Sequence, residues 1–308
     1  MQLDDLFHNA QSRLTTVRDW LRFGVSLFNQ HKLYYGHGTT NAHDEAAYLI
    51  LHSLHLPLDV LEPYLDAALL ENEIHLIAER FKTRVKQQIP APYITNEAML
   101  QGYSFYVDAR AIIPRSFIPE LIIDDKLLPW LEQIDTVNNV LDLCTGNGSI
   151  AIIAADYFYH SAVIAADIDP CALEVAKINL EKYQLEDRVH LVQSDLWNNI
   201  PPQIKFDVIL TNPPYVDRLR MDSLTQEYLH EPQHALFGGD NGLSFIQRIL
   251  NNATSHLNKN GILIVEMGDN RDELEEMYPE LAFTWIESKS GDGFVFVLTA
   301  EQLYSQSK

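Results

Sequence analysis

Short apolar segments alternate with amphipathic stretches through the second half of the chain, and this alternation constrains the fold more than any other feature. Compact segments of this kind are typical of buried strands, and they cover residues 137–143, 162–167, 189–193, 207–211 and 262–266. Intervening stretches such as 171–183 have the length and spacing of helices. Because parallel strands need such crossover connections, the alternation predicts an α/β fold whose parallel sheet carries helices on both faces.

The end of the chain departs from this alternation. Two apolar segments, 283–287 and 294–299, flank Ser290-Gly291-Asp292-Gly293. Glycine beside Ser and Asp is typical of a tight turn. The two segments therefore predict a terminal antiparallel hairpin.

The N-terminal part of the chain has a helical pattern instead. Apolar residues recur there at spacings of three and four, as one face of a helix requires, at Leu14, Val17, Leu21, Val25 and Phe28. Further helices are expected at 59–67 and 72–88, and another near 117–133, ahead of the predicted strands. We therefore expect three parts: a small helical domain at 1–92, a β-hairpin linker at 93–116 and the α/β domain at 117–308.

The charge of the chain limits its partners. It has 43 acidic against 22 basic residues, which gives a formal net charge of −21. A field of this sign repels phosphate backbones and attracts basic molecules, so we expect no direct recognition of nucleic acid. The 46% of hydrophobic and 21% of charged residues are ordinary for a globular protein with a sizeable core.

Cysteine content and hydropathy indicate the compartment. Cys144 and Cys171 are the only cysteines, which argues against a disulfide scaffold and a cysteine-rich metal site, and we expect no metal. The acidic residues 1–5 are unlike an export signal, and no apolar run approaches the roughly 20 residues that span a bilayer. We therefore expect no membrane association and a cytoplasmic location.

The first predicted strand of the sheet runs directly into a glycine turn and then a helix. Ligands bind at the ends of such strands. The glycines let the backbone approach a nucleoside closely, and the aspartate before the turn can accept a hydrogen bond from the amino acid end of the ligand. We expect cofactor contacts from Asp142, Cys144, Thr145, Gly146, Asn147 and Gly148. The glycine pair alone is equally compatible with a simple strand-to-helix turn.

Acidic residues follow the next two strands. Asp167 ends the second strand, where one carboxylate can accept hydrogen bonds from both hydroxyls of a ribose, and we place the adjoining Ile168 in the same site. Asp195 follows the third strand, where it can accept from an adenine amine while Leu196 gives the ring an apolar face. Asp169 is better explained as the cap of the next helix. A capping role is the alternative for Asp195 as well.

The nature of the turn narrows the choice of cofactor. It is acidic and lacks the third glycine of the dinucleotide fingerprint, so it favours a nucleoside without a pyrophosphate. Here the sequence resembles the class I methyltransferases, which have a Rossmann-like fold and use S-adenosyl-L-methionine. Asp142 to Gly148 match their glycine motif, and Asp167 matches their ribose-binding acid.

The fourth strand ends directly in Asn212-Pro213-Pro214-Tyr215, for which we expect a catalytic role. The prolines fix the backbone and remove two amide donors, which leaves rigid carbonyls as acceptors. The Asn212 side-chain oxygen and the Pro213 carbonyl can each accept one proton of a substrate NH2, and Tyr215 offers an aromatic surface to its planar group. Holding both protons directs the nitrogen lone pair at the methyl donor. The alternative is a proline-rich turn capped by Asn212.

Two groups of methyltransferases share this tetrapeptide, those that act on adenine or cytosine in nucleic acid and those that act on protein glutamine. Residues 105–120 resemble the linker of the glutamine N5-methyltransferases, and residues 231–232 and 235–243 resemble the segment after their catalytic loop. Residues 18–22, 35–39, 44–46 and 283–285 resemble the enzymes that modify ribosomal protein three of the large subunit.

This resemblance implies that a basic ribosomal protein is the substrate and that the helical domain recognises it. A release-factor glutamine methyltransferase and an adenine-N6 methyltransferase of nucleic acid are the alternative enzymes. A cofactor-binding protein that has lost its activity is a further alternative, against which the complete set of expected site residues argues.

Arg115 and His37 each have two possible roles. Arg115 on the linker is either a surface cation beside a helix or a residue that contacts the cofactor or closes over the site. We count it with Asn212, Pro213 and Tyr215 among the expected substrate-binding residues. His37, which lies between two glycines, is either part of a flexible turn or a contact to the substrate.

Overall fold

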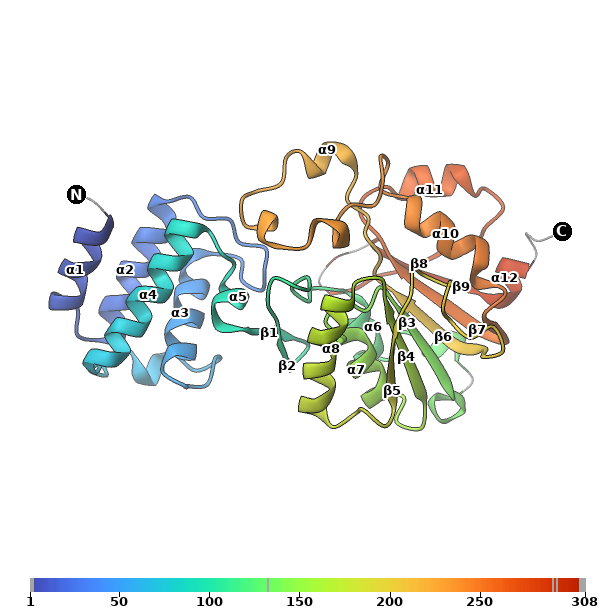
Figure 1. The fold of residues 1–308 in the computed structure, drawn as a ribbon, viewed down its shortest axis with the longest axis horizontal. Coiled ribbons are helices and arrows are strands. Elements are labelled where there is room, and N and C mark those ends of the chain that lie inside the picture. The colour runs from blue at the N-terminus through green and yellow to red at the C-terminus, as the bar shows by residue number, and fades with distance from the viewer. Residues whose placement is uncertain (1–2, 132, 290, 292, 305–308) are drawn as a thin grey trace. The chain divides into compact units, whose positions relative to one another are not determined.

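The computed structural model describes residues 3–131, 133–289, 291 and 293–304, and Figure 1 labels its elements. The chain forms two compact units. The helical unit comprises the residues up to Glu97 together with Thr225–His230, and the α/β unit comprises Ala98–Leu224 and the residues from Glu231 onward. The helical unit therefore contains a short segment from far along the chain, which the contiguous limits expected from the sequence do not include.

The helical unit is built from amphipathic helices whose apolar faces meet in one core. Its helices are α1 (Leu3–Arg13), α2 (Val17–Gln30), α3 (Ala42–Ser53), α4 (Glu71–Gln87) and α5 (Ala91–Thr95). A capping box starts α2: the Asp19 amide donates to Thr16 Oγ1, and the Thr16 amide donates to the Asp19 carboxylate. The predicted apolar stripe faces inward on this helix, where Val17, Leu21 and Phe28 are buried.

A glycine allows two helices of this core to approach closely. Gly24 of α2 faces Phe81 of α4, and a β-carbon at Gly24 would lie 2.5 Å from the Phe81 ring. The same ring meets Trp20 and Phe28 edge-on, at centroid distances of 6.1 and 5.0 Å. A side chain at position 24 would therefore push an aromatic cluster apart.

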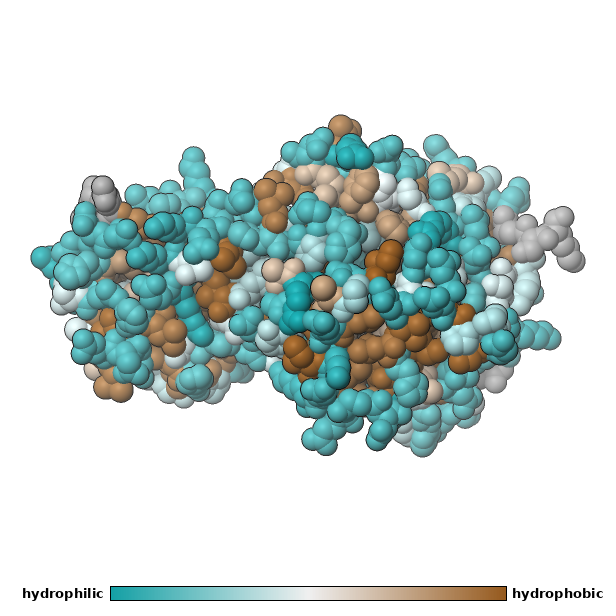
Figure 2. Space-filling model, in the orientation of Figure 1, coloured by the Kyte–Doolittle hydropathy of each residue, from teal (hydrophilic) through white to brown (hydrophobic). Residues whose placement is uncertain are grey.

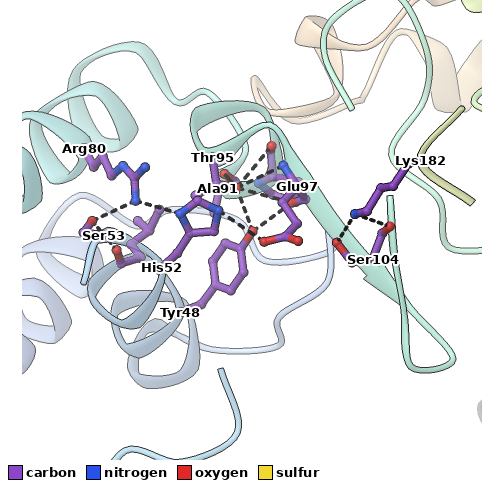
Figure 3. A network of polar contacts seen from close by, with 11 residues as sticks. Tyr48, His52, Ser53, Arg80, Ala91, Thr95, Glu97, Ser104 and Lys182 are labelled. Atoms are coloured by element: carbon purple, nitrogen blue, oxygen red, sulfur yellow. Dashed lines mark hydrogen bonds and ion pairs between the residues drawn. The ribbon is translucent and has the colours of Figure 1, made fainter. Parts of the chain in front are cut away.

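A polar network fixes the point where the chain leaves the helical unit (Figure 3). The Tyr48 hydroxyl lies 2.6 Å from the Thr95 hydroxyl and donates to the Glu97 carbonyl at 2.8 Å. His52 Nδ1 lies 3.0 Å from Arg80 Nη1, and His52 Nε2 lies 3.2 Å from Glu97 Oε2. Because a guanidinium only donates, Nδ1 accepts and Nε2 carries the proton given to the carboxylate. Burial also lowers the pKa of His52, which favours this neutral form.

A seven-stranded sheet forms the centre of the α/β unit, and a two-stranded hairpin of β1 (Glu97–Leu100) and β2 (Tyr103–Tyr106) precedes it. The strands of the large sheet are β3 (Asn139–Leu143), β4 (Ala162–Asp167), β5 (Val189–Gln193), β6 (Phe206–Thr211), β7 (Leu257–Glu266), β8 (Thr284–Ile286) and β9 (Val295–Thr299). They lie in the order β5-β4-β3-β6-β7-β9-β8.

The pairing of these strands confirms the predicted sheet. All pairs from β5 to β7 are parallel, whereas β9 is antiparallel to both β7 and β8. The terminal antiparallel hairpin is therefore present. Ser290 and Asp292 of its expected turn lie outside the described residues.

Helices cover both faces of the sheet, as the alternation predicted. On one face α6 (Ile118–Ile123), α7 (Ser149–Tyr157) and α8 (Pro170–Tyr183) contribute to the core. On the other face the core includes α10 (Ser244–Ala253), α11 (Arg271–Met277) and α12 (Ala300–Tyr304). The connection between β5 and β6, residues 194–205, is fully described and has no α-helix. Figure 2 shows hydrophobic residues gathered over the sheet of this unit. No helix among the described residues is long and apolar enough to cross a membrane.

Two expected helices are shorter than predicted. The segment 117–133, of which residue 132 is not described, has only α6 and the 3-10 helix Leu128–Trp130. Asp125 adopts a left-handed conformation with φ of 59°, and Pro129 lacks an amide donor, so the α-helix cannot continue. The segment 59–67 has only the 3-10 helix Glu62–Tyr64.

Candidate active site

The site lies where the order of the strands reverses. β3 has β4 on one side and β6 on the other, and Leu143 pairs with Ala166 of β4 and with Thr211 of β6. The Thr211 hydroxyl also donates to the Leu143 carbonyl at 2.9 Å. The segments that follow these three strands therefore start side by side at the carboxyl edge of the sheet, where parallel sheets bind ligands.

The glycine turn after β3 and the acid at the end of β4 are joined directly. The Gly146 amide donates to Asp167 Oδ2 at 2.8 Å, and the Asp169 amide donates to Asp167 Oδ1 at 3.0 Å. Burial raises the pKa of Asp167. The Asp169 side chain accepts from the Cys171 amide at the start of α8, which confirms its predicted capping role.

Asp142 lies beneath the glycine turn. Its Oδ2 atom accepts from Thr145 Oγ1 at 2.5 Å and from the Ala151 amide at 3.1 Å. Burial raises the pKa of this carboxyl to about 7. Asp142 lines neither of the two cavities described below, so the contacts that the structure assigns to it hold the turn in shape.

Gly148 begins α7 in a conformation that suits glycine. Its φ is 82°, and a β-carbon there would lie 3.2 Å from the Ala176 Cβ atom of α8. The preceding residue, Asn147, is buried, and its carbonyl accepts from Asn179 Nδ2 at 2.9 Å. The turn is thus packed tightly against α8.

A cavity of about 130 Å³ opens beside this turn. Its lining includes the expected residues Cys144, Gly146, Asp167, Ile168, Asp195, Leu196 and Asn212. The structure therefore brings together residues that follow four different strands. Pro214 of the expected catalytic loop also lines this cavity. The lining further includes residues that the sequence did not assign: Arg110, Ala111, Ile112, Ala172, Ser194, Pro232, His234, Ala235 and Phe245. For Pro232 and Ala235 the resemblance of residues 231–232 and 235–243 was a usable signal, whereas His234 and Phe245 lie outside these stretches.

Asp195, which lines this cavity, and Asp169, which does not, both have basic neighbours. Arg248 Nη2 of α10 donates to Asp195 Oδ1 at 2.7 Å. His234 Nε2 lies 3.1 Å from Asp169 Oδ2. Asp195 therefore has one oxygen engaged by a partly exposed arginine.

Glycines pack closely against the expected catalytic loop, Asn212 to Tyr215. A β-carbon at Gly242, whose φ is 72°, would lie 2.4 Å from the Tyr215 carbonyl oxygen, and one at Gly268 would lie 3.0 Å from the Tyr215 ring. The Val216 amide donates to the Leu236 carbonyl at 2.8 Å. Residues 236–242 and 268 thus hold the loop closely.

A second, smaller cavity adjoins the loop. Its lining includes Arg115, Thr145, Asn147 and Asn212, together with Ile112, Pro114, Ser116, Cys144, Gly146, Ser149 and Ile150. Asn212 lines both cavities. Pro213 and Tyr215 line neither of them, and Pro213 is buried.

Arg115 is held at this second cavity by an ion pair with two hydrogen bonds. Its Nη1 and Nη2 atoms donate to Glu231 Oε1 and Oε2 at 2.6 and 2.7 Å. The fork geometry favours one orientation of the guanidinium. Arg115 is thus more firmly placed than a surface cation beside a helix would be.

The residue after Arg115 is anchored to the end of β7. Ser116 Oγ and the Phe117 amide both donate to Glu266 Oε2, at 2.5 and 2.9 Å. Glu266 is buried, and burial raises its pKa to about 7. Glu266 therefore fixes the linker where it enters the α/β unit, a role that no sequence pattern indicated.

The polar groups at the two cavities suit a nucleoside without a pyrophosphate and a planar acceptor group. Among the described residues, no group of three or more His, Cys, Asp or Glu side chains is placed to hold a metal. Carboxylates can accept from hydroxyls and amines, while the rigid loop presents a side-chain amide and proline carbonyls.

Comparison with known proteins identifies the family. Residues 125–242 match the family model described as Methyltransferase small domain. A ribosomal protein uL3 glutamine methyltransferase of Neisseria meningitidis serogroup A is 52% identical over 98% of this chain and 98% of its own. One of Burkholderia pseudomallei, with the same description, is 46% identical over 94% of this chain and 95% of its own.

A solved structure shares the fold. The catalytic domain of hMettl16, in complex with MAT2A 3'UTR hairpin 1, superimposes with a TM-score of 0.51 at 14% identity, over 78% of this chain and 85% of that one. The solved structure shows the fold alone, whereas the relatives that match nearly the whole chain identify the family. The chain belongs to the ribosomal protein uL3 glutamine methyltransferase family.

Proposed function

We propose that the protein transfers a methyl group from S-adenosyl-L-methionine to the side-chain N5 of a glutamine in ribosomal protein uL3. The names of its full-length relatives support this substrate. The net charge of −21 supports it independently, since an acidic surface attracts basic ribosomal proteins and speeds their encounter. A substrate of this kind also favours a cytoplasmic location.

The residues at the first cavity fit the cofactor. Asp167 and Asp195 offer carboxylates to ribose hydroxyls and an adenine amine, and Leu196 and Ile168 offer apolar surface. At Gly146 a β-carbon would have only Ile112 within 4 Å, at 3.9 Å, so the turn leaves room beside its backbone. When bound, S-adenosyl-L-methionine supplies an electrophilic methyl group.

One buried polar atom at the turn also favours a bound ligand. Asn147 Nδ2 has no hydrogen-bond partner among the described residues. Buried polar groups are normally paired, and an unpaired one costs about 1–3 kcal/mol. Asn147 lines the second cavity, where the amino acid end of a ligand could satisfy its donor.

The loop answers the main chemical difficulty of the reaction. An amide nitrogen shares its lone pair with the carbonyl, as a rotation barrier of about 18–20 kcal/mol shows. Asn212 and the Pro213 carbonyl accept its two protons, and this positions the nitrogen and favours a pyramidal geometry. Their dipoles stabilise the positive charge that develops on nitrogen. One of the two protons is then released to water as the methylated amide forms.

The observation that carries this proposal is the position of Asn212. It lines both the cavity of Asp167 and Asp195 and the cavity of Arg115 and Asn147. A side chain in this position can hold an acceptor next to a methyl donor. Holding the two reacting groups in the correct orientation accounts for much of the rate enhancement of a transfer reaction.

The test uses the purified protein, labelled S-adenosyl-L-methionine and unmodified uL3. Mass spectrometry should locate one methylated glutamine. Asn212→Ala should bind the cofactor and lose turnover, while Asn198→Ala, which alters an exposed asparagine of the same unit, should keep both. Methylation of adenine in DNA or RNA, or of a release factor in preference to uL3, would overturn the assignment.

A further inference from the structure

Three charged side chains are buried together in the helical unit. Arg84 Nε donates to Glu45 Oε1 at 2.6 Å, and Arg84 Nη1 donates to Glu227 Oε1 at 3.2 Å. The side chains of Arg84, Glu45 and Glu227 are only 1%, 2% and 1% exposed. Because loss of one partner leaves a buried charge uncompensated, the three positions are strongly tied to one another.

Backbone groups of the loop before α3 extend this cluster. The Tyr34 amide donates to Glu227 Oε1 at 2.9 Å, and the Tyr34 carbonyl accepts from Arg84 Nη2 at 2.8 Å. The neighbouring Tyr228 ring lies 4.5 Å from the His37 ring, centroid to centroid. His37 is 3% exposed, so the residue between two glycines is packed in the helical unit.

Glu227 and Tyr228 reach this cluster from the other half of the sequence. They belong to Thr225–His230, which we call the strap. Along the chain the strap follows the catalytic loop and the short helix α9 (Arg218–Met221). It is immediately followed by Glu231, which belongs to the α/β unit and holds Arg115 there.

We propose that Glu227 is a positioning residue for the methyl transfer and that it acts through the strap. Arg84 and Tyr34 fix Glu227, and the strap thereby limits the positions open to Glu231. Glu231 in turn sets the guanidinium of Arg115 at the cavity that Asn212 lines. The kinetic part of this inference rests on the proposed function.

The charge and the length of the strap support this role. Glu231, like Glu227, has a fully buried carboxylate, and three residues separate the two. Two buried ion pairs thus hold the two ends of a short span, whose three residues form the 3-10 helix Tyr228–His230. We expect a shift at Glu227 to reach Glu231 along this covalent span.

A matched pair of variants separates positioning from general stability. Glu227→Ala removes the anchor of the strap, whereas Glu45→Ala removes the other carboxylate of Arg84 and leaves the strap bonded. We expect Glu227→Ala to lower kcat for uL3 by about tenfold to a hundredfold, since small displacements far from the reacting atoms have effects of this size. Glu45→Ala should lower the unfolding temperature similarly and keep kcat within about twofold of the unaltered protein.

Two further variants test the route. Glu227→Gln keeps the oxygen that accepts from Tyr34 and should restore most of the lost kcat. Glu231→Gln should lower kcat by itself, and in the double variant Glu227→Ala, Glu231→Gln the two losses should not add, because they interrupt the same chain of contacts. Additive losses, or an equal loss of kcat in Glu45→Ala, would overturn the proposal.

Hydrogen–deuterium exchange makes the test independent of the substrate. Exchange in residues 231–242 should rise in Glu227→Ala and stay unchanged in Glu45→Ala. If the unaltered protein fails to methylate uL3 while this exchange pattern appears, the proposed substrate is wrong and the strap stands. Equal exchange in the two variants would refute the strap whatever the substrate is.

Discussion

Gly238 lies so close to Tyr215 that a β-carbon at position 238 would be 2.6 Å from the Tyr215 Cα atom. The same carbon would be 2.7 Å from the Pro214 carbonyl oxygen. Both atoms belong to the backbone, so neither can turn aside as the end of a flexible side chain does. The shape of the catalytic loop thus depends on the absence of a side chain more than twenty residues away.

Gly238→Ala should therefore displace the loop. We expect turnover to fall by about a hundredfold, because misplacement of about 1 Å is enough for a loss of this size. Binding of S-adenosylhomocysteine, measured by calorimetry, should change little. Gly102→Asn is the control, since a β-carbon there meets nothing within 4 Å and Asn tolerates its φ of 82°. Normal turnover in Gly238→Ala would show that the loop adapts.

Asp167→Asn should weaken cofactor binding. The carboxylate already accepts from the Gly146 and Asp169 amides, and an amide in its place would turn one acceptor into a donor. We expect Kd for S-adenosylhomocysteine to rise by about tenfold to a hundredfold, the usual effect of losing hydrogen bonds to a charged group. Asp187→Asn, at an exposed position of the same unit, should leave Kd unchanged.

Glu266 gives stability a defined pH dependence. Burial raises its pKa from 4.5 to about 7, so between these values the folded protein holds a proton that the unfolded chain releases. The stabilisation from Glu266 is therefore complete below pH 4.5 and is lost as pH rises through about 7.

Glu266→Gln should remove this dependence, since a glutamine oxygen can accept from Ser116 and Phe117 while staying neutral. Urea unfolding at pH 5 and pH 8 measures this effect. From pH 5 to pH 8, the free energy of unfolding of the variant should rise relative to that of the unaltered protein by about 3 kcal/mol. Asp142 has a raised pKa of the same sign, but it is present in both proteins and cancels from the difference. A constant difference across this range would contradict the prediction, and exposed Glu276→Gln controls for the loss of charge.

Arg84→Met should destabilise the helical unit strongly. It leaves the buried carboxylates of Glu45 and Glu227 without their cation, which costs about 3–5 kcal/mol when one partner of a buried pair is removed. Urea unfolding of the full chain measures the change. Arg18→Met, which breaks an exposed pair with Asp66 in the same unit, should have little effect.

The sequence predicted those parts of the site that follow directly from local pattern. A strand, a glycine turn and a helix place Gly146, and the end of the next strand places Asp167 only one sheet neighbour away. Asn212 follows the strand on the other side of β3. Because parallel strands end at a common edge, residues assigned to strand ends converge without any knowledge of distant contacts.

Contacts between distant segments could not be predicted in this way. The packing of Gly238, Gly242 and Gly268 against Tyr215 depends on where later turns fall, and a glycine pattern alone does not give that position. The pair of Arg115 with Glu231 joins residues far apart in sequence, and no local pattern indicates that they are partners. The lengths of two helices were predicted wrongly because a left-handed Asp125 and internal prolines outweighed the apolar spacing.

The division of the helical unit between two chain segments has a consequence for its synthesis. After Glu97 the ribosome adds about 130 further residues before the strap is complete, which takes roughly 7–26 s at about 5–20 residues per second. During this time Arg84 has Glu45 but not Glu227, and the Tyr34 amide lacks its acceptor. The N-terminal part therefore cannot finish folding first, and both units reach their native state only after most of the chain has been translated.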